Sequence, residues 1–288
     1  MSPMINRRSF LQSGLLGSTA LAAATFPSSA LAGVTKPEGD PFHGLKVGMT
    51  SYTLRKFSLD QAIAMTKEAG VKYISLKDVH LPLKSSTAQR REARRKIEAA
   101  GLILMGGGVI SIKNNPDEIH NVFEYAKDAG MPTIICSPDP EALDAVEKMA
   151  KEYDLRIAIH NHGPSDKHYP SPLDVLRLVK DRDSRMGICM DVGHTVRLGE
   201  DPVEVMKKCG GRLHDFHMKD VNAAMAKGEP TVVGEGIIDI VGVLRTFVRM
   251  KYPYHVALEY EAKSDDPMPG VLRSYAYIRG VLAAERLK

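Results

Sequence analysis

Eight short apolar runs recur along the chain after residue 44, and each leads into polar residues and then into the amphipathic pattern of a helix. Strands that alternate with helices in this way are typical of βα units around a parallel sheet. Eight such units predict the fold class α/β, as a single-domain (β/α)8 TIM barrel over residues 45–288. The predicted strands are KVGMTSY (46–52), VKYISLK (71–77), LILMGGG (102–108), PTIICS (132–137), RIAIHNH (156–162), MGICMD (186–191), RLHDFHMK (212–219) and YHVALEY (254–260).

The ends of the predicted helices carry signals of their own. Gly70, Gly101 and Gly130 each follow an alanine just before a predicted strand, and glycine readily adopts the left-handed conformation that closes a helix. The first clear helix opens at Ser58 and has Gln61 three residues later, which is the spacing of a capping box. No linker and no second domain are indicated after residue 44.

Four polar side chains stand at the carboxyl ends of the last four predicted strands. Side chains alternate across a strand, so in RIAIH the two isoleucines face the helices and His160 faces the barrel axis. The same rule points Asp191, His217 and Glu259 inward at the same height. This rim of a TIM barrel is where active sites lie. Two imidazoles and two carboxylates there predict one divalent metal ion, such as manganese, zinc or cobalt.

Other titratable side chains point toward the same rim and are candidates for catalytic proton transfer. His162, Lys219 and Glu261 each lie two residues beyond a predicted ligand, on the inner face. Lys77 and His80 come from the end of the second predicted strand, on the opposite wall. A bound ion stabilises the charge that develops as a proton leaves carbon, and a base near the metal must take that proton.

Each of these candidates has a structural alternative. His162 would order the loop that follows it through a hydrogen bond, and Lys219 would pair with Asp215 or Asp220. Glu261 would be a solvated charge at the rim. The sequence leaves these alternatives open.

The first 32 residues have the pattern of an export signal. Arg7 and Arg8 precede an apolar stretch, and small residues surround Ala32. The paired arginines followed by Phe-Leu resemble a twin-arginine signal. We therefore expect a cleaved leader over residues 1–32, an extension over 33–44, the twin-arginine (Tat) export machinery as a partner, and a periplasmic or otherwise exported location. An ordinary export signal and a retained membrane anchor are the alternatives.

Net charge, cysteine content and the absence of certain motifs restrict the kinds of partner and chemistry that we expect. The chain has 288 residues and a net charge of +4, which is too small to favour nucleic acid or an anionic membrane. Its three cysteines form no C-x-x-C pair, so neither a disulfide framework nor a zinc knot is expected, and Cys189 is interpreted as a small core residue. No G-x-S-x-G nucleophile elbow or phosphate-binding P-loop occurs.

Five fragments in a fixed order carry a resemblance to a known family. They are IAIHNHGP, MDVGHTVRLGEDP, HDFHMKD, GEGIIDI and VALEYE. In this order they resemble the xylose isomerase-like TIM barrels, the sugar phosphate isomerase/epimerase family, and the resemblance covers residues 45–285. It implies a divalent ion held by a glutamate, an aspartate, a histidine and a glutamate on strands five to eight.

One of these four positions departs from the family. Asp191, His217 and Glu259 match the last three ligands, and His160 stands where the family has glutamate. In the sugar epimerases that glutamate also moves protons, as the resemblance implies. The departure removes a carboxylate base but leaves an imidazole, which is a good ligand for zinc, manganese, cobalt or nickel.

The expected substrate is a small carbohydrate. The resemblance implies that His194 contacts it or supports a ligand, and Tyr52 is a further candidate for contact with the substrate. The leading interpretation is a divalent-metal-dependent isomerase or epimerase of a sugar or keto-sugar that works through a metal-stabilised enediolate. A free sugar, a polyol or an oxidised glycoside suits an exported protein better than a sugar phosphate. The resemblance also allows a homo-oligomer.

Three other functions are alternative hypotheses. A lyase or hydrolase that cleaves 3-keto-glycosides by elimination would use the same carbanion. An endonuclease IV-like nuclease shares the barrel and a pair like Asp191 and His194, but it needs many more metal ligands and a basic face for DNA. A non-catalytic sugar-binding barrel would not need all four inward ligands.

Overall fold

The computed structural model describes residues 39–285. The predicted leader and residues 33–38 of the predicted extension lie outside the described residues, so both stay predictions. Among residues 39–285, no helix is both long and apolar enough to span a bilayer.

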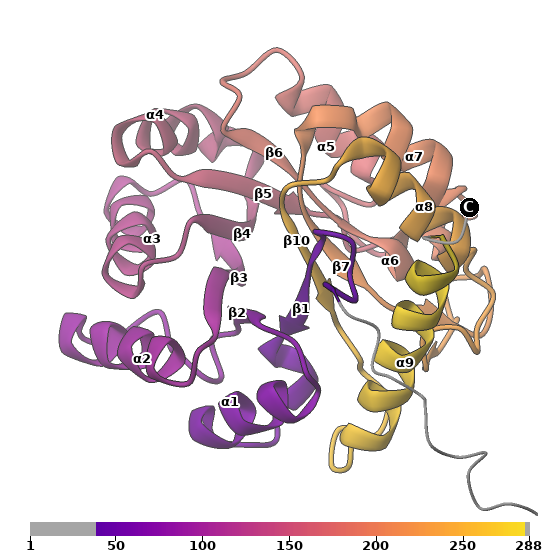
Figure 1. Cartoon of the computed structure of the whole chain (residues 1–288). Helices are drawn as coiled ribbons and strands as arrows, with labels where there is room; N and C mark the ends of the chain where they lie inside the picture. Colours follow the sequence, from indigo (N-terminus) through magenta and orange to yellow (C-terminus); the bar gives the residue numbers. More distant parts are fainter. Residues whose placement is uncertain (1–38, 286–288) are drawn as a thin grey trace, which may run out of the picture. The chain divides into compact units, whose positions relative to one another are not determined.

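Eight parallel strands close into a barrel, in the order β1-β10-β7-β6-β5-β4-β3-β2 (Figure 1). The fold prediction is therefore confirmed, and each predicted strand overlaps an observed one. The barrel strands are β1 (Lys46–Thr50), β2 (Tyr73–Leu76), β3 (Ile103–Ile112), β4 (Thr133–Pro138), β5 (Arg156–His160), β6 (Met186–Asp191), β7 (Leu213–Met218) and β10 (His255–Leu258). A small antiparallel pair, β8 (Asp220–Val221) and β9 (Pro230–Thr231), lies outside the barrel.

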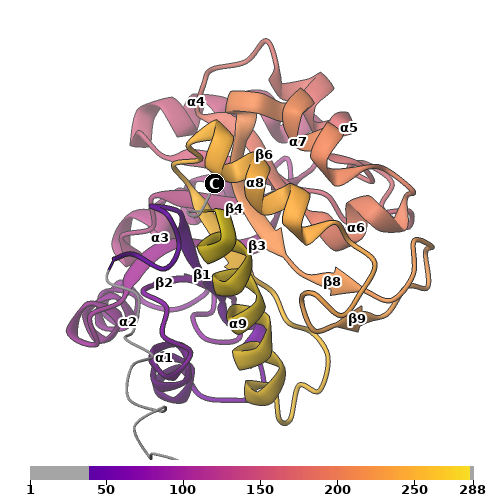
Figure 2. The same cartoon turned by 45° about the vertical axis from the view of Figure 1, so that its right-hand side comes forward.

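Helices surround the barrel (Figure 1), and Figure 2 brings α8 and α9, which pack against each other, toward the viewer. They are α1 (Leu59–Glu68), α2 (Thr87–Ala99), α3 (Pro116–Ala129), α4 (Leu143–Tyr153), α5 (Pro172–Val179), α6 (Val192–Arg197), α7 (Pro202–Cys209), α8 (Ile240–Met250) and α9 (Met268–Glu285). Short 3-10 turns occur at η2 (Ser51–Leu54), η3 (Pro140–Ala142) and η4 (Gly210–Arg212).

The helix ends follow the local chemistry of the sequence. The Ser58 hydroxyl accepts the backbone N–H of Gln61 at 3.3 Å, and the Gln61 side chain accepts the backbone N–H of Ser58 at 2.9 Å. This confirms the predicted capping box. Gly70, Gly101 and Gly130 have φ angles of 72°, 76° and 70°, so all three are left-handed as expected.

The barrel wall separates two apolar regions. Ile157 and Ile159 belong to the large core between the strands and the helices. Ile135, Ala158 and Cys189 form a separate small cluster inside the barrel. The predicted alternation of inward and outward side chains is therefore confirmed. This inner apolar cluster is small, and buried polar side chains occupy the barrel interior toward the carboxyl ends of the strands.

The loop after β7 is held against the barrel by one buried carboxylate. Asp220 accepts the backbone N–H groups of Gly234, Gly236 and Ile238 at 2.9, 3.0 and 3.1 Å, as well as that of Val221. A side chain at Gly236 would overlap the Asp220 carboxylate. The glycines of GEGIID thus leave room for the Asp220 carboxylate and shape this loop.

Candidate metal centre

Four side chains converge at the carboxyl ends of β5, β6, β7 and β10. His160 and Asp191 are the last residues of β5 and β6, His217 lies in β7, and Glu259 directly follows β10. All four are buried. One ligand atom from each residue lies within 4.8 Å of the others. The structure thus brings together the four residues that the sequence predicts as metal ligands.

The spacing of these atoms suits a tetrahedral ion. His160 Nε2 lies 3.1 Å from His217 Nδ1 and 3.6 Å from Asp191 Oδ2. His217 Nδ1 lies 3.3 Å from Glu259 Oε2. Four N or O ligands about 2.1 Å from a tetrahedral ion are separated from one another by about 3.4 Å. The donor set therefore fits a divalent metal in both chemistry and spacing.

The two imidazoles are in different electrostatic surroundings. Burial lowers the pKa of His160 to about 3, which keeps its ring neutral, as a metal ligand must be. Burial also disfavours charge on His217, but the carboxylates of Glu259, Asp215 and Asp191 outweigh burial and raise the pKa of that ring. The neutral ring at β5 and the ring among carboxylates at β7 are therefore not equivalent ligands.

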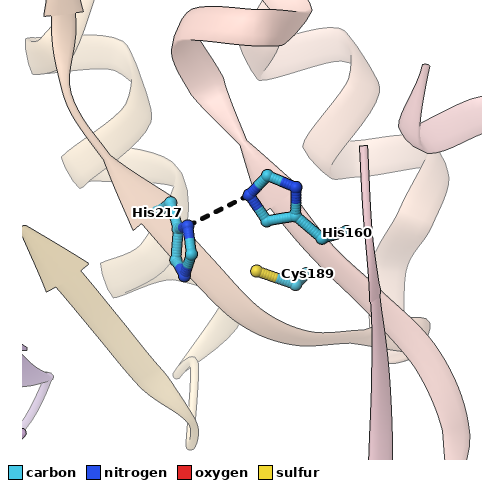
Figure 3. A group of neighbouring side chains, drawn as sticks. All are labelled: His160, Cys189 and His217. Atoms are coloured by element: carbon cyan, nitrogen blue, oxygen red, sulfur yellow. Dashed lines mark hydrogen bonds between the residues drawn. The ribbon is translucent and has the colours of Figure 1, made fainter. Parts of the chain in front are cut away.

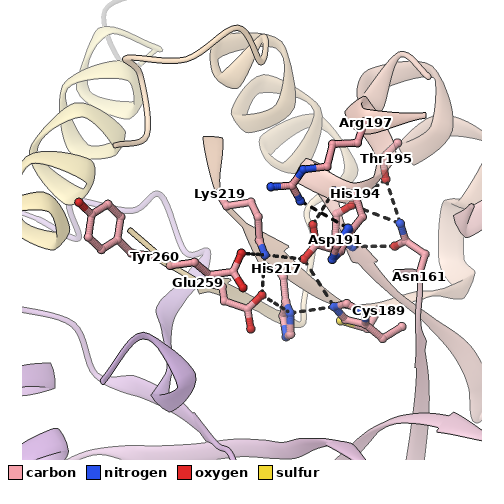
Figure 4. Close-up of polar contacts among 12 residues, drawn as sticks. Asn161, Cys189, Asp191, His194, Thr195, Arg197, His217, Lys219, Glu259 and Tyr260 are labelled. Atoms are coloured by element: carbon pink, nitrogen blue, oxygen red, sulfur yellow. Dashed lines mark hydrogen bonds and ion pairs between the residues drawn. The ribbon is translucent and has the colours of Figure 1, made fainter. Parts of the chain in front are cut away.

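Lys219 supplies the positive charge that the carboxylates face (Figure 4). Its Nζ lies 2.8 Å from Asp191 Oδ2, 2.7 Å from Glu259 Oε2 and 2.9 Å from Glu261 Oε2, and its side chain is 1% exposed. Burial opposes the charge of Lys219, but these three carboxylates raise its pKa well above the usual range. Lys219 therefore pairs with Asp191, Glu259 and Glu261, and not with Asp215 or Asp220 as the structural alternative had it.

The ammonium also sets the charge of the predicted ligands. Burial raises the pKa of a carboxyl group, yet Lys219 holds the pKa values of Asp191 and Glu259 well below their usual range. Both are therefore carboxylates at neutral pH. The two oxygens that face His160 and His217 are the same two that Lys219 contacts.

A cavity of about 220 Å³ opens onto this cluster. Two of the predicted ligands, His160 and Glu259, line it together with five other residues that the sequence predicts at the site. The lining residues are Tyr52, Lys77, Val109, His160, His162, His194, Glu259 and Glu261. The rings of His162 and His194 lie 4.4 and 6.1 Å from the ring of His160, between centroids.

His162 and His194 are held at the cavity by neighbouring groups. His162 Nδ1 lies 3.1 Å from Asp166 Oδ2, and His194 Nδ1 lies 3.4 Å from a guanidinium nitrogen of Arg197. The backbone N–H of His194 donates to Asp191 Oδ1 at 2.8 Å. Burial lowers the pKa of both imidazoles, so each is neutral near pH 7 and able to accept a proton.

His80 takes a different place from the other candidates. Its ring nitrogens lie 2.9 Å from Ser51 Oγ and 3.1 Å from the Phe57 carbonyl oxygen, and the ring faces a separate hollow beside α2. The same Ser51 hydroxyl accepts the backbone N–H of Lys77, whose Nζ donates to the Val109 carbonyl. The structure thus brings Lys77 to the cavity at the metal centre, while His80 supports the turn after β1.

Two buried side chains near the centre had no functional role in the sequence interpretation. The Cys189 thiol lies beside the rings of His160 and His217 (Figure 3), and these three side chains form a second group with metal-ligating atoms. Burial raises the pKa of this thiol well above its usual value, in keeping with a core residue. The Asn161 side chain accepts the backbone N–H of Asp191 at 2.8 Å and so orients the end of β6.

The sequence pattern of the Xylose isomerase-like TIM barrel family matches residues 63–280. The chain belongs to this family. The resemblance carried by the five ordered fragments is thereby confirmed. The match covers most of the barrel and includes the four converging side chains.

The curated relatives of the chain include inosose dehydratases. An inosose dehydratase of Clostridium botulinum is 25% identical over 154 residues, which cover 48% of this chain and 51% of that enzyme. The chain thus spans about half the length of the curated relatives it matches. A solved structure from Parabacteroides distasonis is 25% identical, with a TM-score of 0.65 and coverage of 82% of this chain and 99% of that one.

The 3-keto-D-glucoside 4-epimerase of E. coli is similar in fold. Its structure matches with a TM-score of 0.67 over 82% of this chain and 99% of that chain, at 15% identity. An identity this low shows the shared barrel alone.

Removal of the Lys219 charge will destabilise the fold. In Lys219→Met, the buried Asp191 and Glu259 lose their cation, and breaking a buried ion pair by removing one partner costs about 3–5 kcal/mol. Urea unfolding in the presence of a chelator measures the loss. The exposed Lys180→Met is the control and should change stability by less than about 0.5 kcal/mol. Equal stabilities of the two variants would contradict the role given to Lys219.

Stability will fall as the pH is lowered from 7 to 5. Burial lowers the pKa values of His160, His214 and His255 to about 3, 4 and 3. Between these values and the ordinary value near 6.5, the unfolded chain takes up protons that the folded chain does not. Each such ring therefore costs about 2 kcal/mol between pH 7 and pH 5.

Unfolding free energies across this pH range test the effect. His255→Leu should reduce the slope by about one proton, or about 1.4 kcal/mol per pH unit near pH 5. The exposed His168→Leu is the control and should leave the slope unchanged. A slope that is the same in wild type and His255→Leu would show that the buried ring does not resist protonation.

Proposed function

We propose that this chain is a divalent-metal-dependent enzyme that moves a proton at a carbon next to a carbonyl of a sugar or keto-sugar, as an isomerase or epimerase. One observation carries the proposal. Ligand atoms of His160, Asp191, His217 and Glu259 converge within 4.8 Å of one another, and His160 and Glu259 line the cavity beside them. A divalent ion held there would act as a Lewis acid that stabilises negative charge on a substrate oxygen.

The chain supplies proton-transfer groups on two sides of this cavity. His162 and His194 follow β5 and β6, and both are neutral near pH 7, so either can act as a base. Tyr52 and Lys77 follow β1 and β2 and line the same cavity from the other side. A proton can thus be removed on one face of a carbon and returned on the other, which is what epimerisation requires.

Because position 160 holds an imidazole that faces the ligand cluster, we assign the role of general base to another residue. His160 is almost fully buried and faces Asp191 and His217, so its free electron pair is directed at the ligand cluster. His162 lies two residues further on and is 36% exposed. His162 is therefore the imidazole after β5 that can reach a substrate, and it takes the place of a carboxylate base.

Lys219 is buried against Glu259 and Glu261, which both line the cavity. The ammonium is fixed against Glu259 and Glu261 at 2.7 and 2.9 Å. It donates hydrogen bonds toward the centre and favours the negative charge that develops on a substrate oxygen. Glu261 lines the cavity and accepts from Lys219, which fixes the direction of the ammonium.

A second candidate is a lyase or glycoside-cleaving enzyme that expels a group β to the carbonyl by elimination. Two observations favour keeping it: the inosose dehydratases are among the relatives, and the position of His160 carries no carboxylate. The size of the cavity, about 220 Å³, suits one small carbohydrate in either reaction. Export through the twin-arginine pathway and assembly into a homo-oligomer remain proposals that rest on the leader and on the family resemblance.

Metal content is the first test of the proposed site. Purified wild type, reconstituted with zinc, manganese or cobalt, should hold about one equivalent by elemental analysis, and His160→Ala and Glu259→Ala should lose it. Glu68→Ala, an exposed carboxylate on α1, is the matched control and should keep the metal. Metal lost only in Glu259→Ala would leave a three-ligand site. Wild type without metal after reconstitution would overturn the proposed function.

Turnover in D2O separates the two reactions. An epimerase should introduce one deuterium at the carbon next to the carbonyl and return a sugar with all its substituents, as read by mass spectrometry and NMR. A lyase should release the β-substituent from a 3-keto-glycoside. His162→Asn should lower kcat by about 100-fold or more if His162 is the base. Bound metal with no turnover on any sugar or keto-glycoside would favour a binding protein.

A further inference from the structure

A second layer of polar side chains lies in the barrel directly beneath the metal centre. Asp215 on β7 is in register with Cys189 on β6 and with His255 on β10. Asp215 and His255 are each 1% exposed. In the layer above, Asp191 is in register with His217, which follows Asp215 by two residues on the same face of β7. Asp215 therefore stands under His217.

The two ring nitrogens of His217 face different layers. Nδ1 faces the ligand cluster, 3.1 Å from His160 Nε2 and 3.3 Å from Glu259 Oε2. Nε2 faces the lower layer, 3.9 Å from Asp215 Oδ1. An imidazole that binds a metal through one nitrogen carries its proton on the other, and that N–H usually donates to a carboxylate or a carbonyl. Asp215 is the acidic group that Nε2 faces; burial raises the pKa of Asp215 to about 7, against the opposing effect of His217.

The atoms between the two layers lack other partners. Within residues 39–285, no hydrogen bond is made by His217 Nε2, by Asp215 Oδ2, by either ring nitrogen of His255 or by the Tyr252 hydroxyl. His255 Nδ1 lies 3.7 Å from Asp215 Oδ2, and Cys189 Sγ lies 3.7 Å from Asp215 Oδ1. Burying polar groups without hydrogen-bond partners costs folding free energy. A functional role for Asp215 would explain why an acidic side chain lies in this layer.

We propose that Asp215 is a positioning residue of the metal centre. Its carboxylate accepts the Nε2–H of His217, directly or through one water, and so holds the ring in the tautomer that leaves Nδ1 free for the metal. The backbone of β1 leaves room for this layer, because a Cβ at Gly48 would overlap His255 Nε2. Among residues 39–285, the carboxylate contact of His160 is to Asp191 and is made by Nε2, the nitrogen that faces the cluster, while Nδ1 makes no hydrogen bond. His217 is thus the anchored imidazole of the pair.

The inference rests on the metal site of the proposed function, and metal affinity tests it without the need for a substrate. Zinc and cobalt dissociation constants are measured by competition with a chromogenic chelator. Asp215→Leu, similar in size and without an acceptor, should bind metal about 10–100-fold more weakly. Asp215→Asn should fall between this variant and wild type, because its amide oxygen can still accept. Asp183→Asn, at the amino end of β6, is the like-for-like control and should match wild type.

Thermal unfolding with a chelator separates a positioning role from a structural one. Asp215→Leu removes a buried acid whose Oδ2 has no hydrogen-bond partner and whose Oδ1 accepts only weakly from the Cys189 thiol at 3.7 Å, so its metal-free melting temperature should equal or exceed that of wild type. Weaker metal binding in a variant that is not less stable supports the inference. If the leucine variant does not fold, several-fold weaker binding by Asp215→Asn supports it.

Two outcomes would overturn the inference. Equal metal affinity in wild type and both Asp215 variants, or equal affinity in Asp215→Asn if Asp215→Leu does not fold, removes the positioning role and leaves the proposed function in place. A wild type that binds no zinc or cobalt overturns the proposed function and this inference together.

Discussion

Buried carboxylates at the top of the barrel must face a positive charge, and this constraint organises the centre of the molecule. An isolated carboxylate is too costly to bury, so it either becomes neutral or finds a cation. Asp191 and Glu259 find the ammonium of Lys219, at 2.8 and 2.7 Å. Because one lysine faces three carboxylates, the cluster keeps a surplus of negative charge that suits a divalent ion.

The register of β6, β7 and β10 places the polar side chains inside the barrel in two layers. His217 lies beside Asp191 across one strand pair, and Asp215 lies beside Cys189 one layer below. The upper layer opens to the cavity, and the lower layer is closed to solvent. A metal ligand in the upper layer can therefore be oriented from beneath by a residue that never meets a substrate. The small size of the inner apolar cluster leaves space for both layers.

The same frame can serve more than one reaction, since function resides in the site and not in the fold. Relatives include inosose dehydratases, and a 3-keto-D-glucoside 4-epimerase shares the barrel. In the mechanism that we propose, epimerisation and elimination would both begin with loss of a proton beside a carbonyl. What separates them is whether a second group returns the proton or a substituent leaves. Under the proposed function, the groups that would decide this are His162 and His194 on one wall of the cavity and Lys77 on the other.

The sequence by itself determined the βα repeat, the helix ends at Ser58 and Gly70, and the inward direction of the four predicted ligands. These follow from local rules, because alternation along a strand and capping at a helix end involve only neighbouring residues. Only the tertiary structure decided the partners of Lys219, the position of His80 away from the cavity and the layer of Asp215 under His217. Such contacts join residues far apart in the chain, and their distances depend on strand register and barrel closure, which no local pattern specifies.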